Sequence, residues 1–267
     1  MGDRQPINDV PDVSPPAAKP PVAKPTVLDI RGLQKSFTLH NRGGQFIRGL
    51  SGVDLTVGEG EHVALAGTSG AGKSSLLKCV YRTYLSSAGQ ILFRNTTGQQ
   101  VDLAELDERA MADIRDREIG YVSQFLRAEP RRTTFDVVRR AGNRRGMVGS
   151  EAVDAAVQAL RDVRIPESLW SSFPSVLSGG ERQRVNIAKG TIASPRLLLL
   201  DEPVSALDPE NREAVLERIA GLRANNVALL SVFHDLDAMR RLATRVVLLR
   251  EGLVTDNGAP EDVLALT

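Results

Sequence analysis

The sequence predicts an α/β fold with a mixed sheet at its core, and two segments carry this prediction. Residues 67–74 read Gly-Thr-Ser-Gly-Ala-Gly-Lys-Ser, a complete phosphate-binding loop that follows the apolar run 62–66 and precedes the helical run 75–80. A strand, a loop and a helix in this order are the context that the motif requires. Residues 197–200 are four consecutive leucines, a pattern typical of a strand buried on both faces of a parallel sheet.

The first part of the chain is predicted to hold a tail, followed by strands and turns. Residues 1–25 hold seven of the 14 prolines and almost no apolar pattern, so we expect a disordered, proline-rich tail. Apolar alternation predicts strands at 27–30 and 53–57. Turn residues 95–98 predict a hairpin whose arms are the apolar runs on either side, 89–93 and 101–103.

Helical patterns dominate the middle of the chain. We expect a helix over 105–117, a strand over 119–123 and then a helical segment over about 125–177. Within that segment, residues 151–162 form the clearest amphipathic helix. Its apolar face is predicted to carry Val153, Ala156, Val157 and Leu160.

The last third of the sequence returns to alternating helices and strands. Pro209 and Glu210 predict the start of a helix that runs to Leu222, because proline is favoured in the first turn. The apolar run 227–233 predicts another buried strand, and residues 251–252 predict the turn of a terminal hairpin.

The composition argues against a transmembrane protein and against a general nucleic-acid-binding protein. The chain has 267 residues, a net charge of +1 and one cysteine, Cys79, which we expect to be a buried small hydrophobe. No apolar stretch approaches the ~20 residues needed to cross a bilayer. We therefore expect a cytoplasmic chain with no nucleic-acid partner and no direct membrane insertion.

The phosphate-binding loop predicts a nucleoside triphosphate as ligand. Its glycines allow a tight turn whose N–H groups point at phosphate oxygens, and the following helix adds its positive end. Lys73 is expected to reach the β- and γ-phosphates, and the Ser74 hydroxyl to ligate Mg²⁺. The predicted nucleotide contacts are Gly67, Thr68, Ser69, Gly70, Ala71, Gly72, Lys73, Ser74 and Ser75.

Two acids follow the leucine-rich strand. Asp201 and Glu202 fall at its carboxyl end, where open α/β sheets bind their ligands. We expect Asp201 to hold Mg²⁺, usually through water. Glu202 is expected to orient or deprotonate the attacking water.

A second anion site is predicted at residues 178–180. Ser178 is a good N-cap residue for the arginine-rich helix behind it, and Gly179 and Gly180 leave backbone amides unshielded at the helix start. This site lies far along the chain from the phosphate-binding loop.

Along the chain, the phosphate-binding loop is followed by Leu-Ser-Gly-Gly-Glu at 177–181 and Asp-Glu-Pro at 201–203. These three motifs, in this chain order, resemble the ABC (ATP-binding cassette) ATPase family over roughly residues 27–262. The resemblance implies the P-loop NTPase ABC ATPase fold, with a mixed sheet core, an antiparallel β-subdomain and an inserted helical subdomain. It implies an ATP hydrolase with ATP and Mg²⁺ as cofactors. The ABC ATPase domain would span residues 26–262, between the tail and a short C-terminal end, 263–267.

The resemblance also assigns roles to single residues. Gln124 matches a glutamine that touches Mg²⁺ and the attacking water, and His234 matches a switch histidine at the γ-phosphate. Asp208 ends a loop, 205–208, that crosses a dimer interface. With Lys73 and Glu202, Gln124 and His234 complete the expected catalytic set; Ser74, Gln124 and Asp201 form the metal set.

In the family, adenine stacks on an aromatic residue upstream of the phosphate-binding loop. Phe37 is the better match and Phe46 the alternative, because the predicted loop 38–45 makes the register uncertain. Val204 departs from the threonine that the family commonly carries there, and we expect little effect on hydrolysis.

The resemblance implies a head-to-tail cassette dimer in which residues 178–180 of one chain face the nucleotide of the other, and it leaves homo- and heterodimers open. The arginine-rich run 127–145 has two interpretations. It forms either a solvated face or part of a surface that docks an acidic partner.

Several segments resemble the PhnL subfamily, the second ATP-binding protein of the phosphonate carbon–phosphorus (C–P) lyase system. Asn186 and Phe233 are informative, because transporter ATPases usually carry alanine and threonine there. The matching segments are 81–85, 122–127, 165–170, 185–190 and 233–235. This resemblance implies, as partners, a second ABC ATPase subunit and the C–P lyase core complex.

Two other functions remain open from the sequence. One is the ATP-binding subunit of an ABC membrane transporter or lipoprotein-release system. The other is a non-catalytic assembly module that uses ATP only as a clamp. Glu202 and His234 are both present, which argues against the clamp.

Overall fold

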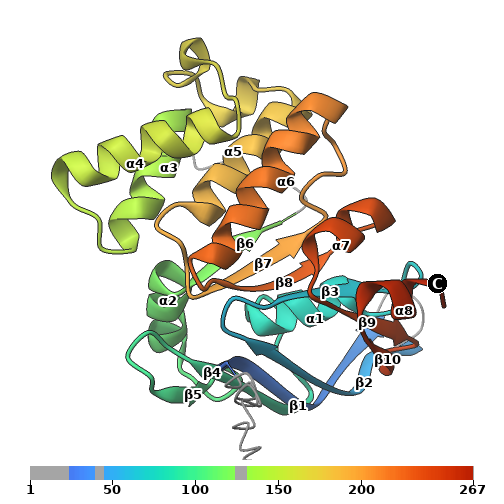
Figure 1. The fold of residues 1–267 in the computed structure, drawn as a ribbon. Helices are drawn as coiled ribbons and strands as arrows, with labels where there is room; N and C mark the ends of the chain where they lie inside the picture. The colour runs from blue at the N-terminus through green and yellow to red at the C-terminus, as the bar shows by residue number, and fades with distance from the viewer. Residues whose placement is uncertain (1–23, 40–44, 124–130, 267) are drawn as a thin grey trace, which may run out of the picture.

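The computed structural model describes residues 24–39, 45–123 and 131–266, which form two sheets with helices packed around them (Figure 1). The larger sheet has the strand order β10-β9-β3-β8-β7-β6. Its strands are β3 (His62–Ala66), β6 (Ile119–Val122), β7 (Leu197–Asp201), β8 (Ala228–Val232), β9 (Arg245–Arg250) and β10 (Leu253–Gly258). Neighbouring strands run parallel except β10, which pairs antiparallel with β9. The predicted mixed α/β core is therefore confirmed.

The central strands are buried on both faces, as the leucine run predicts. Every residue of β3, β7 and β8 is buried. Leu198 and Leu200 join one core cluster, whereas Leu197 and Leu199 join the other, because successive side chains of a strand point to opposite faces. The sheet thus separates two hydrophobic cores and holds its strand ends rigidly.

The smaller sheet is antiparallel and has the order β2-β1-β4-β5. Its strands are β1 (Thr26–Leu39), β2 (Gln45–Gly58), β4 (Ala88–Arg94) and β5 (Gln100–Asp102). The predicted strands 27–30 and 53–57 were too short, because register shifts between β1 and β2 interrupt the apolar alternation. The predicted loop 38–45 was too long: Thr38 pairs with Phe46, and residues 40–44 lie outside the described part.

The helices cover both faces of the larger sheet (Figure 1). On one face, α1 (Lys73–Val80) lies between the two sheets; on the other, α5 (Gly179–Thr191), α6 (Pro209–Ala224) and α7 (Leu236–Leu242) pack. The remaining helices are α2 (Glu108–Arg117), α3 (Thr134–Arg144), α4 (Gly149–Asp162) and α8 (Pro260–Leu264), with short 3-10 turns η2 (Glu167–Leu169) and η3 (Pro174–Val176). Among the described helices, none is long and apolar enough to cross a membrane.

Two helix predictions need correction. The helix expected over 105–117 begins only at Glu108, because the Asp107 carboxylate accepts the Ala110 amide and caps the helix there. In α4 the predicted apolar face is rotated, since Val153 is 38% exposed. The buried face consists of Ala152, Ala156, Ala159 and Leu160.

The arginine-rich run is not simply a solvated face. Arg145 is half-buried, and its Nη1 donates to the carbonyl oxygens of Ile192 at 2.6 Å and Lys189 at 3.3 Å. It thereby satisfies carbonyl groups at the end of α5. Burial lowers the pKa of Arg145 to about 10, against the opposing effect of nearby Tyr81 and Asp116. Part of the basic run therefore holds helices together.

Candidate active site

The phosphate-binding loop runs between two other backbone segments, and its glycines are sterically required. Gly67 and Gly72 have φ angles of 133° and 104°, which L side chains rarely adopt. A Cβ on Gly67 would collide with the Leu249 carbonyl oxygen, and one on Gly72 with that of Gly49. The loop therefore sits against both sheets and enters α1 with fixed geometry.

Lys73 lies over this loop at the first residue of α1. Its side chain is buried, and Nζ donates to the carbonyl oxygens of Gly67 at 2.6 Å and Thr68 at 2.9 Å. Burial lowers the pKa of Lys73, while the negative charges of Glu202 and Asp201 act in the opposite direction. An anion bound in the loop would offset the free-energy cost of burying this ammonium charge.

Ser74 and Asp201 meet at the end of β7. Ser74 Oγ donates to Asp201 Oδ1 at 2.8 Å, and the Tyr121 hydroxyl donates to Asp201 Oδ2 at 3.4 Å. A hydroxyl and a buried carboxylate are the hard oxygen donors that Mg²⁺ prefers. No group of three or more His, Cys, Asp or Glu forms a metal cage in the described ranges. The pair of donors, one hydroxyl and one carboxylate, fits Mg²⁺, which is usually held by one or two carboxylates together with substrate phosphates.

Glu202 and His234 face each other across the ends of neighbouring parallel strands. His234 Nε2 lies 2.8 Å from Glu202 Oε1. Glu202 has a φ angle of 53°, and its amide donates to the Val232 carbonyl oxygen at 3.0 Å. A non-glycine residue in this conformation carries strain, which the hydrogen bond to β8 helps to offset.

A cavity of about 250 Å³ joins these groups. Its lining includes Glu202, His234 and Phe37, and from the loop region Ser69, Gly70, Gly72, Lys73, Ser74 and Ser75. The Phe37 ring is half-buried, 5.3 Å from the Tyr84 ring centre in an edge-on arrangement. Phe46, by contrast, is 61% exposed and does not line the cavity. Of the two aromatic candidates, only Phe37 is placed to contact a nucleotide in this cavity.

The second anion site forms an exposed helix start. Ser178 Oγ accepts the Glu181 amide at 3.3 Å, and Glu181 Oε2 accepts the Ser178 amide at 2.7 Å, a complete capping box. The hydrogen bond from the Ser178 backbone lowers the pKa of Glu181. A Cβ on Gly179 would meet nothing within 4 Å, so this helix start is open to a ligand.

The loop 205–208 lies beside this helix start. A Cβ on Gly180 would lie 3.3 Å from the Ala206 carbonyl oxygen. Asp208 is exposed and caps α6, and hydrogen bonds from the Asn211 amide and side chain lower its pKa. Neither residues 178–180 nor Asp208 line the cavity of about 250 Å³. The chain therefore presents two separate half-sites.

The structure adds contacts that sequence patterns did not indicate. Tyr121 reaches Asp201, and Asn186 Nδ2 donates to the Ser123 carbonyl oxygen at 2.8 Å. Gln124 itself lies outside the described residues, so its predicted role stays a prediction. No repeating pattern in the sequence predicts these contacts, because each joins two residues that are more than 60 positions apart.

The comparisons with known proteins agree with this geometry. The family described as “ABC transporter” matches residues 50–205. A “Putative peptide import ATP-binding protein” of Brucella melitensis is 37% identical over 253 residues, which cover 89% of this chain and 72% of that protein. The general L-amino acid transport ATP-binding protein AapP of Rhizobium johnstonii is 34% identical over 212 residues, 79% of each chain.

A solved structure shows the same fold with a nucleotide bound. It is the dimeric structure of a post-hydrolysis state of an ATP-binding cassette bound to ADP and Pi. It superposes with a TM-score of 0.79 at 26% identity, covering 87% of this chain and 98% of that one.

We expect Gly72→Ala to abolish ATP binding, because its Cβ would collide with the Gly49 backbone and displace the loop. Gly70→Ala is the matched control. Gly70 also has a positive φ, 83°, but a Cβ there meets nothing within 4 Å. Titration with a fluorescent ATP analogue should show a loss of at least about tenfold for Gly72→Ala, and a smaller loss for Gly70→Ala, whose cost is backbone strain alone. Equal losses would show that the close approach to Gly49 does not matter.

Proposed function

Because this chain belongs to the ABC transporter family, we propose that it is the ATP-binding subunit of a solute import system. As a member of that family it is an ATP hydrolase, with ATP and Mg²⁺ as its cofactors. The observation that carries the proposal is the similarity, over 89% and 79% of the chain, to ATP-binding proteins named for peptide import and L-amino acid transport.

The binding roles follow from the two half-sites. Residues 67–75 and the Lys73 ammonium group bind the phosphates, and Phe37 contacts the adenine. Ser74 and Asp201, joined by their 2.8 Å hydrogen bond, hold Mg²⁺ together with Gln124. The ion supplies positive charge that offsets the negative charge of the phosphates.

The hydrolytic step depends on Glu202 and His234. Glu202 orients a water molecule toward the γ-phosphate and accepts its proton as the water oxygen bonds to the γ-phosphorus. The bond from that phosphorus to the β–γ bridging oxygen breaks, and ADP is the leaving group. His234 contacts the γ-phosphate and, through its 2.8 Å contact, keeps the Glu202 carboxylate in place. Lys73 stabilises the negative charge on the phosphoryl oxygens. Catalysis in this arrangement is positioning and electrostatic stabilisation.

The second half-site acts on a partner's nucleotide. ABC cassettes form dimers, as the related post-hydrolysis structure does. In the proposed head-to-tail dimer, the exposed helix start at residues 178–180 contacts the γ-phosphate bound by the partner, and Asp208 crosses the interface. ATP then closes the dimer because it bridges both chains, and hydrolysis lets it open. The partner is either a second copy or a sister cassette.

A second candidate is the phosphonate C–P lyase system, favoured by Asn186 and Phe233. Asn186 is buried and holds the Ser123 carbonyl oxygen, one residue before Gln124. Phe233 is buried directly before His234. Both unusual residues therefore lie next to a residue, Gln124 or His234, that we propose contacts the bound nucleotide or its Mg²⁺. The named relatives, however, are import ATPases, so transport is the function we place first.

We expect Glu202→Gln to leave ATP binding within about threefold of the parent while lowering kcat at least about a hundredfold, since the amide cannot accept a proton. Steady-state phosphate release measures kcat, and equilibrium binding of radiolabelled ATP measures affinity. Unchanged phosphate release would remove Glu202 from its role.

Ser178→Arg should spare nucleotide binding but block closure of the dimer, because a large cation would fill the exposed helix start. ATP-dependent dimerisation is measured by size-exclusion chromatography in the Glu202→Gln background. Ser178→Ala is the control: it removes the helix cap, worth about 1 kcal/mol, without filling the site. Full dimerisation of the Ser178→Arg variant would contradict the head-to-tail arrangement.

Affinity purification of Glu202→Gln protein from its native cells, with ATP and Mg²⁺ present, tests the proposed function. We expect an integral membrane permease to be recovered with the ATP-bound protein. Recovery of soluble C–P lyase subunits with a sister ATPase would instead overturn the transport proposal and establish the second candidate.

A further inference from the structure

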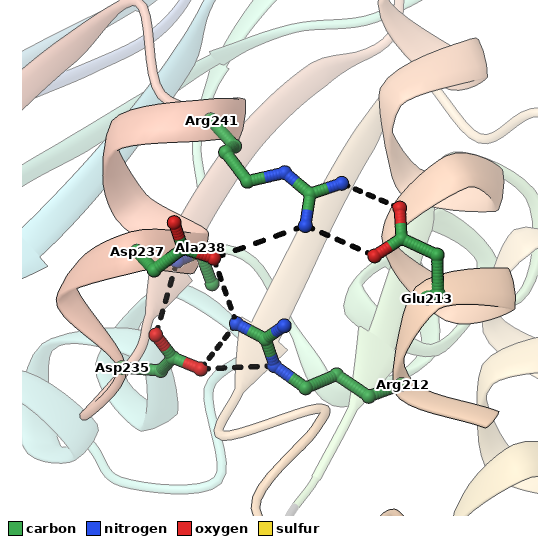
Figure 2. Close-up of polar contacts among 6 residues, drawn as sticks. All are labelled: Arg212, Glu213, Asp235, Asp237, Ala238 and Arg241. Atoms are coloured by element: carbon green, nitrogen blue, oxygen red, sulfur yellow. Dashed lines mark hydrogen bonds and ion pairs between the residues drawn. The ribbon is translucent and has the colours of Figure 1, made fainter. Parts of the chain in front are cut away.

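An ion-pair network joins the first turns of α6 to the start of α7 (Figure 2). Arg212, on α6, donates from both Nε and Nη2 to Asp235 Oδ2, with an Nε–Oδ2 distance of 2.9 Å. Nη2 also donates to Asp237 Oδ2 at 3.2 Å. The other carboxylate oxygen of Asp235 accepts the Ala238 amide at 3.1 Å and caps α7. Both oxygens of Asp235 are therefore engaged.

The two ends of this contact adjoin the two half-sites. The Arg212 amide donates to the Asp208 carbonyl oxygen at 2.8 Å, so Arg212 lies one helical turn after the interface loop 205–208. Asp235 directly follows His234, which contacts Glu202. Among the described side chains, Arg212 connects the first turn of α6 with the N-cap of α7. A shift of the α6 start would therefore be carried to the histidine.

The ion pair is partly withdrawn from water. The Arg212 and Asp235 side chains are 22% and 35% exposed. Burial raises the pKa of Asp235, but the hydrogen bonds from the Ala238 amide and from Arg212 outweigh it, and the net pKa lies below its usual value. Asp235 thus stays ionised at neutral pH, so the link to Arg212 is charged on both sides.

We propose that Arg212 is a positioning residue that couples docking of the partner cassette on the 205–208 loop to the placement of His234. The coupling deepens the proposed function and rests on the proposed roles of His234 and of that loop. Contact with the partner fixes the position of the α6 start. The ion pair of Arg212 with Asp235 then fixes the position of Asp235, and His234 is held beside Glu202. Without the link, each site still binds ATP but the histidine is no longer fixed when the dimer closes.

The chain supplies a matched control in the same network. Arg241, on α7, pairs with Glu213 of α6, with Nη1 donating to Oε2 at 3.0 Å (Figure 2). This pair also ties α6 to α7. Arg241 Nη1 lies 3.8 Å from Oδ2 of Asp237, which Arg212 also contacts, but Arg241 does not contact Asp235 (Figure 2). Its side chains are 41% and 42% exposed, so its loss should cost little. Arg241→Met therefore reports the docking of the two helices without the link to the histidine.

The test is a steady-state comparison of kcat and KM for ATP in the full chain. We expect Arg212→Met to lower kcat about tenfold with KM within about twofold, since the phosphate-binding loop is untouched. Arg212→Lys should recover part of this loss, and Arg241→Met should stay within about twofold of the parent. In the Glu202→Gln background, Arg212→Met should still dimerise with ATP, which separates the coupling from closure.

Asp235→Asn isolates the ion pair from the helix cap, because asparagine is as good an N-cap as aspartate. We expect it to lower kcat as much as Arg212→Met does, and the double variant to fall no further. Equal losses in Arg212→Met and Arg241→Met, additive losses in the double variant, or a parental kcat in Arg212→Met would each overturn the coupling.

One further variant separates this inference from its premise. If His234→Ala is inactive while Arg212→Met is unaffected, only the coupling fails. If His234→Ala keeps the parental kcat, the role assigned to the histidine fails, and the coupling with it. Neither outcome depends on the identity of the membrane or lyase partner, because each variant is compared with the parent chain in the same cassette dimer.

Discussion

The parallel pairing of β3, β7 and β8 is the constraint on which the site depends. Parallel strands end at the same edge of a sheet, so the loop after β3, the acids after β7 and the histidine after β8 converge although they are up to about 170 residues apart in the chain. Burial of all three strands on both faces fixes these ends in place. The 2.8 Å contacts Ser74–Asp201 and Glu202–His234 are direct consequences of this pairing.

The groups at this edge were largely predictable from sequence, because each one follows a short apolar run with a distinctive local motif. Boundaries and faces were less predictable. Helix α2 begins after Asp107 because this residue caps it. Apolar periodicity does not indicate which of several nearby residues will act as the cap. In α4, alanines rather than valines face the core, since close packing of helices favours small side chains that hydrophobicity alone ranks lower.

Long-range polar contacts were not predictable at all. The contacts Arg212–Asp235 and Asn186–Ser123 join residues that no repeating sequence pattern relates. In an arginine-rich segment, the sequence also does not indicate which arginine will form an ion pair. Arg145 illustrates this point, because it lies within a basic run but is half-buried and donates to carbonyl groups of α5 and its C-cap. Such contacts become visible only when the sheets and helices fix which surfaces meet.

The placement of the second half-site is the reason why we propose that one chain alone is an incomplete enzyme. The capped start of α5 and the 205–208 loop lie together, outside the cavity that holds Lys73, Glu202 and His234. In the proposed dimer, this surface does not reach its own chain's nucleotide and acts on the partner's. Closure would then control hydrolysis, and α6 and the start of α7, which lie between the two half-sites, would be the route by which closure is sensed. The same scaffold therefore suits an import system or a soluble lyase, and what distinguishes them is the partner that drives closure.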